Sequence, residues 1–93
     1  MMATKYAHIL QRVIETIEGF RAGSVPIDNL QAVLSSAADT VSLPEEQALS
    51  DMLRKAEGKI EMARFMSEPA SMSVKIEAVL QIVTTGVEAA MLP

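Results

Sequence analysis

The chain has 93 residues with a net charge of −4, and it contains no cysteine. This length fits one domain. The absence of cysteine excludes a disulfide scaffold or a cysteine metal site and suits a reducing compartment. The eight basic residues are dispersed and only three residues are aromatic, whereas nucleic-acid binding relies on clustered lysine and arginine and on stacking aromatics. We therefore expect a cytoplasmic protein that binds no nucleic acid.

Pro26, Pro44 and Pro69 divide the chain into four segments, each with apolar residues at three- and four-residue spacing. Such spacing is typical of amphipathic helices. It predicts an all-α fold, in which residues 1–93 form a single small four-helix bundle. Because the connections are short, neighbouring helices should be mostly antiparallel. The predicted helices span residues 5–22, 26–41, 44–66 and 73–90.

The first two segments have well-marked ends. Gly23 is a candidate helix stop, because glycine readily adopts the left-handed conformation that ends many helices. Pro26 then suits a first helical turn, where a missing N–H is tolerated. The apolar stripe of the first segment comprises Tyr6, Ile9, Leu10, Val13, Ile17 and Phe20, and that of the second comprises Ile27, Leu30, Leu34, Ala37, Ala38 and Val41.

The third segment opens with Ser42 three residues before Glu45, the spacing of a capping box. Its apolar stripe comprises Leu49, Met52, Leu53, Ala56, Ile60 and Ala63. A straight helix would leave Phe65 nearly opposite this stripe, exposed in an adaptable apolar patch. A bend at Gly58 or an earlier end would turn the ring inward. We expect Phe65 to be buried.

The fourth segment contains the apolar stretch AVLQIVTTGV at 78–87, about half the ~20 residues of a membrane helix. Ser71 or Ser73 is the expected N-cap. One face carries Ile76, Val79, Leu80, Val83, Val87, Ala90 and Met91, and a shoulder beside it carries Ala78, Ile82, Gly86 and Ala89. So broad an apolar surface requires neighbours on two sides. We expect two other helices to cover it, and the alternative is that the shoulder meets a partner or a second copy in a homodimer.

No pattern predicts catalysis. His8 is the only histidine and lies opposite the first apolar stripe, where we expect it to be solvated. Glu57 with Glu61, and Glu15 with Glu18, lack the further ligands of bundle metal sites. There is no GxSxG motif, and the four glycines form no phosphate loop. The sequence therefore predicts a protein that is not an enzyme, with no metal and no cofactor.

Acidic residues follow the outer faces of the second and third helices. Asp28 and Asp39 frame Gln31 and Ser35 on one helix. Such faces can steer a basic partner and raise its association rate. The candidate partner-binding residues are Asp28, Asp39, Glu46, Glu57 and Glu61, with Phe65 as an apolar anchor.

The run YAHILQRVIETIEGFRAGSVPIDNL at 6–30 contains Phe20, Gly23, Ile27 and Leu30, and GKIEMARF follows at 58–65. Over residues 6–66 the chain resembles small bacterial all-helical immunity proteins, which neutralise a toxin. The resemblance implies an inhibitor that occludes another protein, such as a basic toxin. It transfers no binding residues, because these families vary most where they bind. The alternative is a structural or chaperone subunit that associates through the apolar face of the fourth helix.

Overall fold

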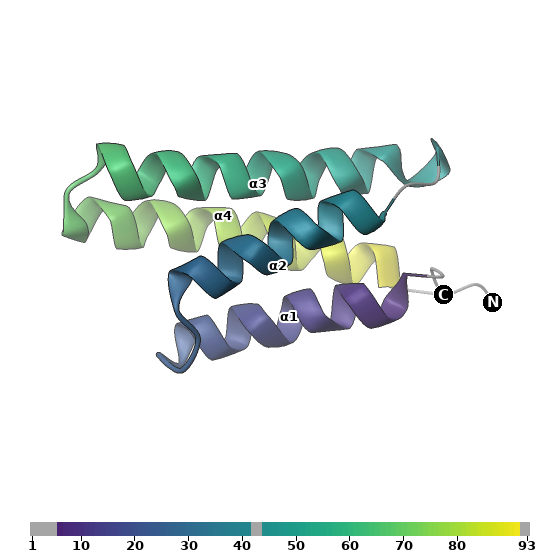
Figure 1. Cartoon of the computed structure of the whole chain (residues 1–93), viewed down its shortest axis with the longest axis horizontal. Coiled ribbons are helices and arrows are strands. Elements are labelled where there is room, and N and C mark those ends of the chain that lie inside the picture. The colour runs from purple at the N-terminus through teal and green to yellow at the C-terminus, as the bar shows by residue number, and fades with distance from the viewer. Residues whose placement is uncertain (1–5, 42–43, 92–93) are drawn as a thin grey trace.

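A computed structural model describes residues 6–41 and 44–91 of the chain and confirms the all-α fold. The described chain forms four α-helices, and Figure 1 shows that each runs opposite to the one before it. A single 3-10 turn, η1 (Pro44–Glu46), precedes the third helix. The helices are α1 (Ala7–Arg21), α2 (Ile27–Thr40), α3 (Gln47–Met66) and α4 (Pro69–Met91).

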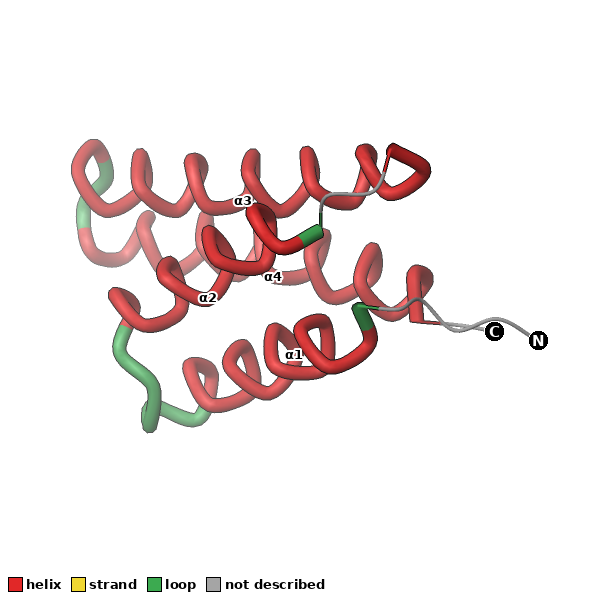
Figure 2. The backbone as a smooth tube through the Cα atoms, turned by 45° about the vertical axis from the view of Figure 1, so that its right-hand side comes forward, coloured by secondary structure: helices red, strands yellow, loops and turns green. Residues whose placement is uncertain are grey.

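The four helices close into a ring in which each packs against two others. The contacts join α1 to α2, α2 to α3, α3 to α4 and α4 back to α1, and this last interface is the smallest. Figure 2 shows α3 and α4 side by side along most of their length, with α1 and α2 on one side of that pair. The other side of the α3/α4 pair is covered by no helix of the described chain.

The core consists of the apolar stripes that the sequence predicts. Every helix contributes side chains that are almost completely buried, and Gln31 and Ser50 are the buried polar residues of the described chain. Burial of each large aliphatic side chain stabilises the fold by roughly 1.5–3 kcal/mol relative to exposure. The largest fully buried side chains are Leu10, Ile17, Leu30, Leu34, Leu53, Ile60, Leu80, Val13, Val83 and Val87.

The turn between α1 and α2 is a Schellman motif centred on Gly23. Its φ of 84° lies in the left-handed region. The Gly23 N–H donates to the Phe20 carbonyl at 3.0 Å, and the Ser24 N–H donates to the Gly19 carbonyl at 2.9 Å. Both bonds satisfy carbonyls that the end of α1 would otherwise leave unpaired. The predicted helix stop is confirmed.

Two helix starts differ from prediction by three residues or more. The 3-10 turn η1 shortens α3, and Ser42 of the predicted capping box lies outside the described residues. Helix α4 begins at Pro69, four residues before the predicted start at 73. A proline at the first position loses no helical hydrogen bond, because that N–H has no partner in any helix. Ser71 and Ser73 therefore lie inside α4, and their assignment as N-caps is wrong.

The expected burial of Phe65 is also wrong. Helix α3 continues through Gly58 to Met66 as one helix, so Phe65 stays on the face away from α2 and α4. The ring is 73% exposed, and the Arg64 guanidinium lies 5.8 Å from its centroid. Gly58 itself faces open space, since no atom lies within 4 Å of where its Cβ would stand.

The glycines of α1 and α3 provide a matched test of these packing distances. Gly58→Ala should raise the free energy of unfolding by about 0.5–1 kcal/mol, because alanine has the better helix propensity and meets no neighbour. Gly19→Ala should give no such gain, since its Cβ would lie 2.5 Å from Val25 Cγ2. Urea denaturation of both variants checks this. A larger gain for Gly19→Ala than for Gly58→Ala would contradict the packing.

Candidate functional site

Most of the predicted acidic residues converge on a glutamine that fastens α2 to α3. The Gln31 side chain is buried, and its Nε2 donates to Glu57 Oε2 at 3.0 Å and to Glu61 Oε1 at 2.7 Å. Its Oε1 accepts from Arg64 Nη1 at 2.7 Å, and the same guanidinium pairs with Asp28. All the hydrogen-bonding positions of this buried amide except one lone pair are thereby occupied.

Sequence reasoning placed Gln31 on the outer face of the second helix, and this was wrong. Gln31 follows Ile27 by four residues and precedes Leu34 by three, so helical periodicity alone puts it on the buried face. Its polarity concealed that signal. A glutamine within an apolar stripe indicates a buried polar contact, and here the contact is to two carboxylates and an arginine.

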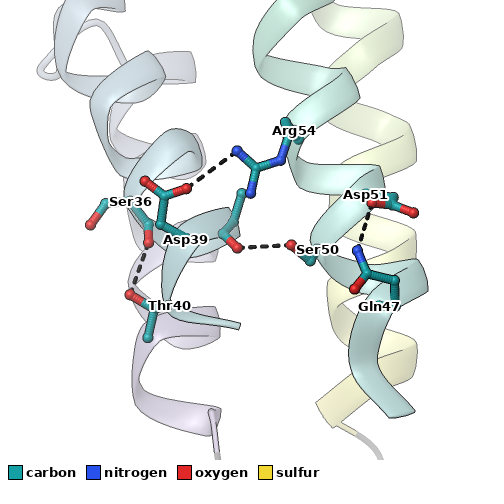
Figure 3. A network of polar contacts seen from close by, with 8 residues as sticks. Ser36, Asp39, Thr40, Gln47, Ser50, Asp51 and Arg54 are labelled. Carbon is teal, nitrogen blue, oxygen red and sulfur yellow. Dashed lines mark hydrogen bonds and ion pairs between the residues drawn. The ribbon is translucent and has the colours of Figure 1, made fainter. Parts of the chain in front are cut away.

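A second group of polar contacts lies at the other end of the α2–α3 interface (Figure 3). The buried Ser50 hydroxyl donates to the Ala38 carbonyl at 2.8 Å. That carbonyl belongs to the last turn of α2, where no further helical N–H is available. Beside it, Arg54 and Asp39 form an exposed ion pair at 3.2 Å. Glu46 takes part in neither group.

The acidic candidates therefore differ in how free their charge is. Asp28 and Asp39 each face an arginine, which neutralises much of their field. Glu57 and Glu61 accept hydrogen bonds from Gln31 but form no ion pair within the described chain. The negative charge left for a partner on this face is concentrated at these two glutamates.

The uncovered side of the α3/α4 pair carries an apolar groove. One part has a volume of about 560 Å³ and is lined by Met62, Met66, Ala78 and Ile82 among others. An adjoining hollow of about 400 Å³ continues along the same helices to Met52. Both parts share Lys59, Val79 and Ile82. The exposed large apolar side chains of the described chain are Met62, Phe65, Met66, Val74 and Ile82.

The broad apolar surface of α4 is thus only partly covered by the other helices. Helix α4 packs against both α3 and α1, as expected. Ala78, Ile82 and Ala89 of its shoulder nevertheless remain exposed. Gly86 does not belong with them, because a Cβ there would lie 2.8 Å from Met52 Cε of the same chain. Ala78 and Ile82 line the groove with the methionines of α3, whereas Ala89 lines a separate hollow with Gln11 and Ile14 of α1.

Arginines and lysines of the described chain differ in their contacts. Arg21, Arg54 and Arg64 each form an ion pair with a carboxylate. No lysine of the described chain does so, and all three of them line the groove: Lys55, Lys59 and Lys75. Of these, Lys75 donates to the Ser67 hydroxyl at 2.9 Å. The groove therefore has an apolar floor and a basic rim on a protein whose net charge is negative.

The smallest interface, α1 with α4, is held by a two-pronged ion pair. Arg21 Nε and Nη2 donate to the two Glu77 carboxylate oxygens at 3.1 and 2.8 Å. Gln81 donates to the same carboxylate at 3.2 Å. The hydrogen bond from Arg21 is the main cause that lowers the pKa of Glu77 below its ordinary value.

No cluster of metal-binding side chains occurs among the described residues. His8 is exposed, as expected. Within residues 6–41 and 44–91 no three histidine, aspartate or glutamate side chains gather as a metal site would require. The helices there are also too short or too polar to cross a bilayer. Comparison with protein-family models, curated proteins and solved structures finds no match.

Replacement of Gln31 by leucine tests the buried polar contacts. Gln31→Leu should lower the free energy of unfolding by about 1–3 kcal/mol, because hydrogen bonds to charged groups are lost and two carboxylates are left without their donor. The control is Gln47→Leu, whose amide bonds Asp51 within one exposed helical turn. That change should cost less than about 0.5 kcal/mol. Chemical denaturation that ranks the two equally would contradict the role of Gln31.

Glu77→Gln tests the ion pair between α1 and α4 through its pH dependence. The wild type should exceed the variant by less than about 1 kcal/mol in unfolding free energy, since the pair is partly exposed. Because the folded-state pKa is lowered, this advantage is complete above the ordinary value of 4.5. It declines as the pH falls from there through the folded-state pKa. Denaturation curves recorded across this range check the sign, which a growing advantage at low pH would contradict.

Proposed function

We propose that this chain is a non-catalytic protein-binding module whose α3/α4 groove receives an amphipathic helix of another protein. The observation that carries the proposal is the continuous uncovered groove, which is lined by the exposed side chains of Ile82 and Met62. Soluble monomers rarely leave large contiguous apolar patches in water, and those that they leave often mark interaction sites. This role corresponds to a structural or chaperone subunit that associates through α4.

The groove has the length and the side chains that such a helix requires. The part of its α3 wall from Met52 to Met66 rises over fourteen residue steps, or about 21 Å of helix. A partner helix of about four turns would lie along it and insert residues at i, i+3, i+4 and i+7. The unbranched methionines on the walls adapt their shape to different apolar residues. A groove of this kind selects its partner helix by shape and hydrophobicity more than by specific hydrogen bonds.

An immunity-type inhibitor remains the second candidate, and one observation favours it. Glu57 and Glu61 lie next to each other on α3 with no ion pair in the described chain. Two such carboxylates, with Phe65 further along the helix, would attract and anchor the basic cleft of a toxin. We place either activity in the cytoplasm, because the chain contains no cysteine.

Capture experiments with matched variants distinguish the two candidates. Ile82→Asp places a charge in the groove and should abolish recovery of a partner that wild type retains in stoichiometric amounts. Ala32→Asp, on the exposed face of α2, is the control and should retain it. Circular dichroism should show both variants folded.

Capture lost instead on Glu57→Lys, and retained by Ile82→Asp, would contradict groove binding and support the inhibitor. Sedimentation of the wild type as a homodimer that Ile82→Asp dissociates, with no second protein captured, would contradict both.

A further inference from the structure

We propose that the helix received by the groove is acidic, with aspartate or glutamate on both flanks of its apolar face. This inference rests on the proposed function, since it names the chemistry of the partner at the same groove. The observation behind it is the basic rim of the groove: Lys55 and Lys59 line the groove from α3, and Lys75 lines it from α4.

The three lysines of the described chain all lie along this groove, although the whole chain has four more acidic than basic residues. Arg21, Arg54 and Arg64 are paired with carboxylates, whereas Arg12 and the three lysines of the described chain form no ion pair. Asp51 is the one carboxylate among the lining residues of the described chain; it lies one helical turn before Lys55, and Gln47 donates to it.

The spacing of the lysines fits a helix docked along the groove. Lys55 and Lys59 are one turn apart on the same side of α3, about 6 Å along the axis. Lys75 reaches the groove from the opposite helix, near Ser67. Their aliphatic stems extend the apolar walls while the ammonium groups stay at the water boundary. Acidic residues on both edges of the bound helix would therefore meet a lysine.

A second copy of the chain is a poor occupant by the same reasoning. Pairing of this face with itself about a two-fold axis brings like surface to like surface. Lys59 lines both parts of the groove, so it lies near the middle and would face its own copy. Like charges opposed in this way disfavour the dimer. The groove therefore favours a partner of opposite charge.

Two synthetic probes test the charge preference directly. Both are fluorescein-labelled peptides of about sixteen residues with the same leucines at helical spacing. One carries glutamate at the flanking positions and the other carries lysine. Fluorescence anisotropy should show that the full-length protein binds the glutamate peptide at least tenfold more tightly. The preference should shrink as ionic strength rises above about 0.1 M, because the charges lie at the water boundary.

Two protein variants identify the source of the preference. Lys59→Glu should reverse the ranking of the peptides, and Arg12→Glu, an exposed basic position on α1, should leave it unchanged. Ile82→Asp should abolish binding of both. Equal binding of the two peptides, lost on Ile82→Asp but insensitive to Lys59→Glu, would overturn the acidic partner and leave the groove function standing.

Other occupants give distinct results. If neither peptide binds wild type, both the acidic partner and the groove function fail. Co-sedimentation with phosphatidylglycerol vesicles, lost on Lys59→Glu and without binding of the glutamate peptide, would overturn the proposal in favour of an anionic lipid surface. Peptide binding without co-sedimentation would support it.

Discussion

The breadth of the apolar surface on α4 is the constraint on which the rest of the structure depends. The helix is rich in β-branched residues, which have modest helix propensity, so packing against neighbours stabilises it more than its own backbone does. Its main face is buried, with Leu80, Val83 and Val87 almost inaccessible to solvent. A ring of four helices supplies only two neighbours to each member. The part of the apolar surface of α4 that these two neighbours leave uncovered lines the groove.

Helix α3 joins two surfaces of opposite chemistry. Toward α2 it presents charged and polar groups with fixed partners, and arginine suits that role because its planar guanidinium holds several donors in one geometry. Toward the groove it presents lysine and methionine, whose flexible stems allow many arrangements. The first surface fastens the fold. The second has the features of a surface that adjusts to what binds it.

Helical periodicity was sufficient for the fold, because a buried stripe leaves the same three- and four-residue spacing whatever its neighbours are. It found the core of all four helices, and it found Gly23, whose role depends only on local backbone geometry. Gln31 was misplaced because its polarity concealed a position that the same periodicity puts on the buried face. The start of α4 was missed because serine is the commoner signal of a helix start. Here Pro69 occupies the first helical position, where its missing N–H costs no hydrogen bond.

The candidate site was less accessible from the sequence. Asp28 and Glu61 are far apart in the chain, and nothing local shows that both meet near Gln31. The groove is likewise shared between helices, and each of its walls looks like an ordinary helix surface when taken alone. The exposure of Phe65 depends on whether α3 continues past Gly58, which is a property of the whole bundle. Tertiary packing decides which side chains are exposed and which distant residues come together.

The ring arrangement also has a consequence for how the chain folds. Three of its four interfaces join helices that follow one another in sequence, and only α1 with α4 joins distant segments. Such a low contact order is typical of proteins that fold in microseconds to milliseconds. The α1–α4 contact must wait for the longest loop to close, and it is the smallest of the four. This seam should consequently be the last to form and the first to open in native-state hydrogen exchange.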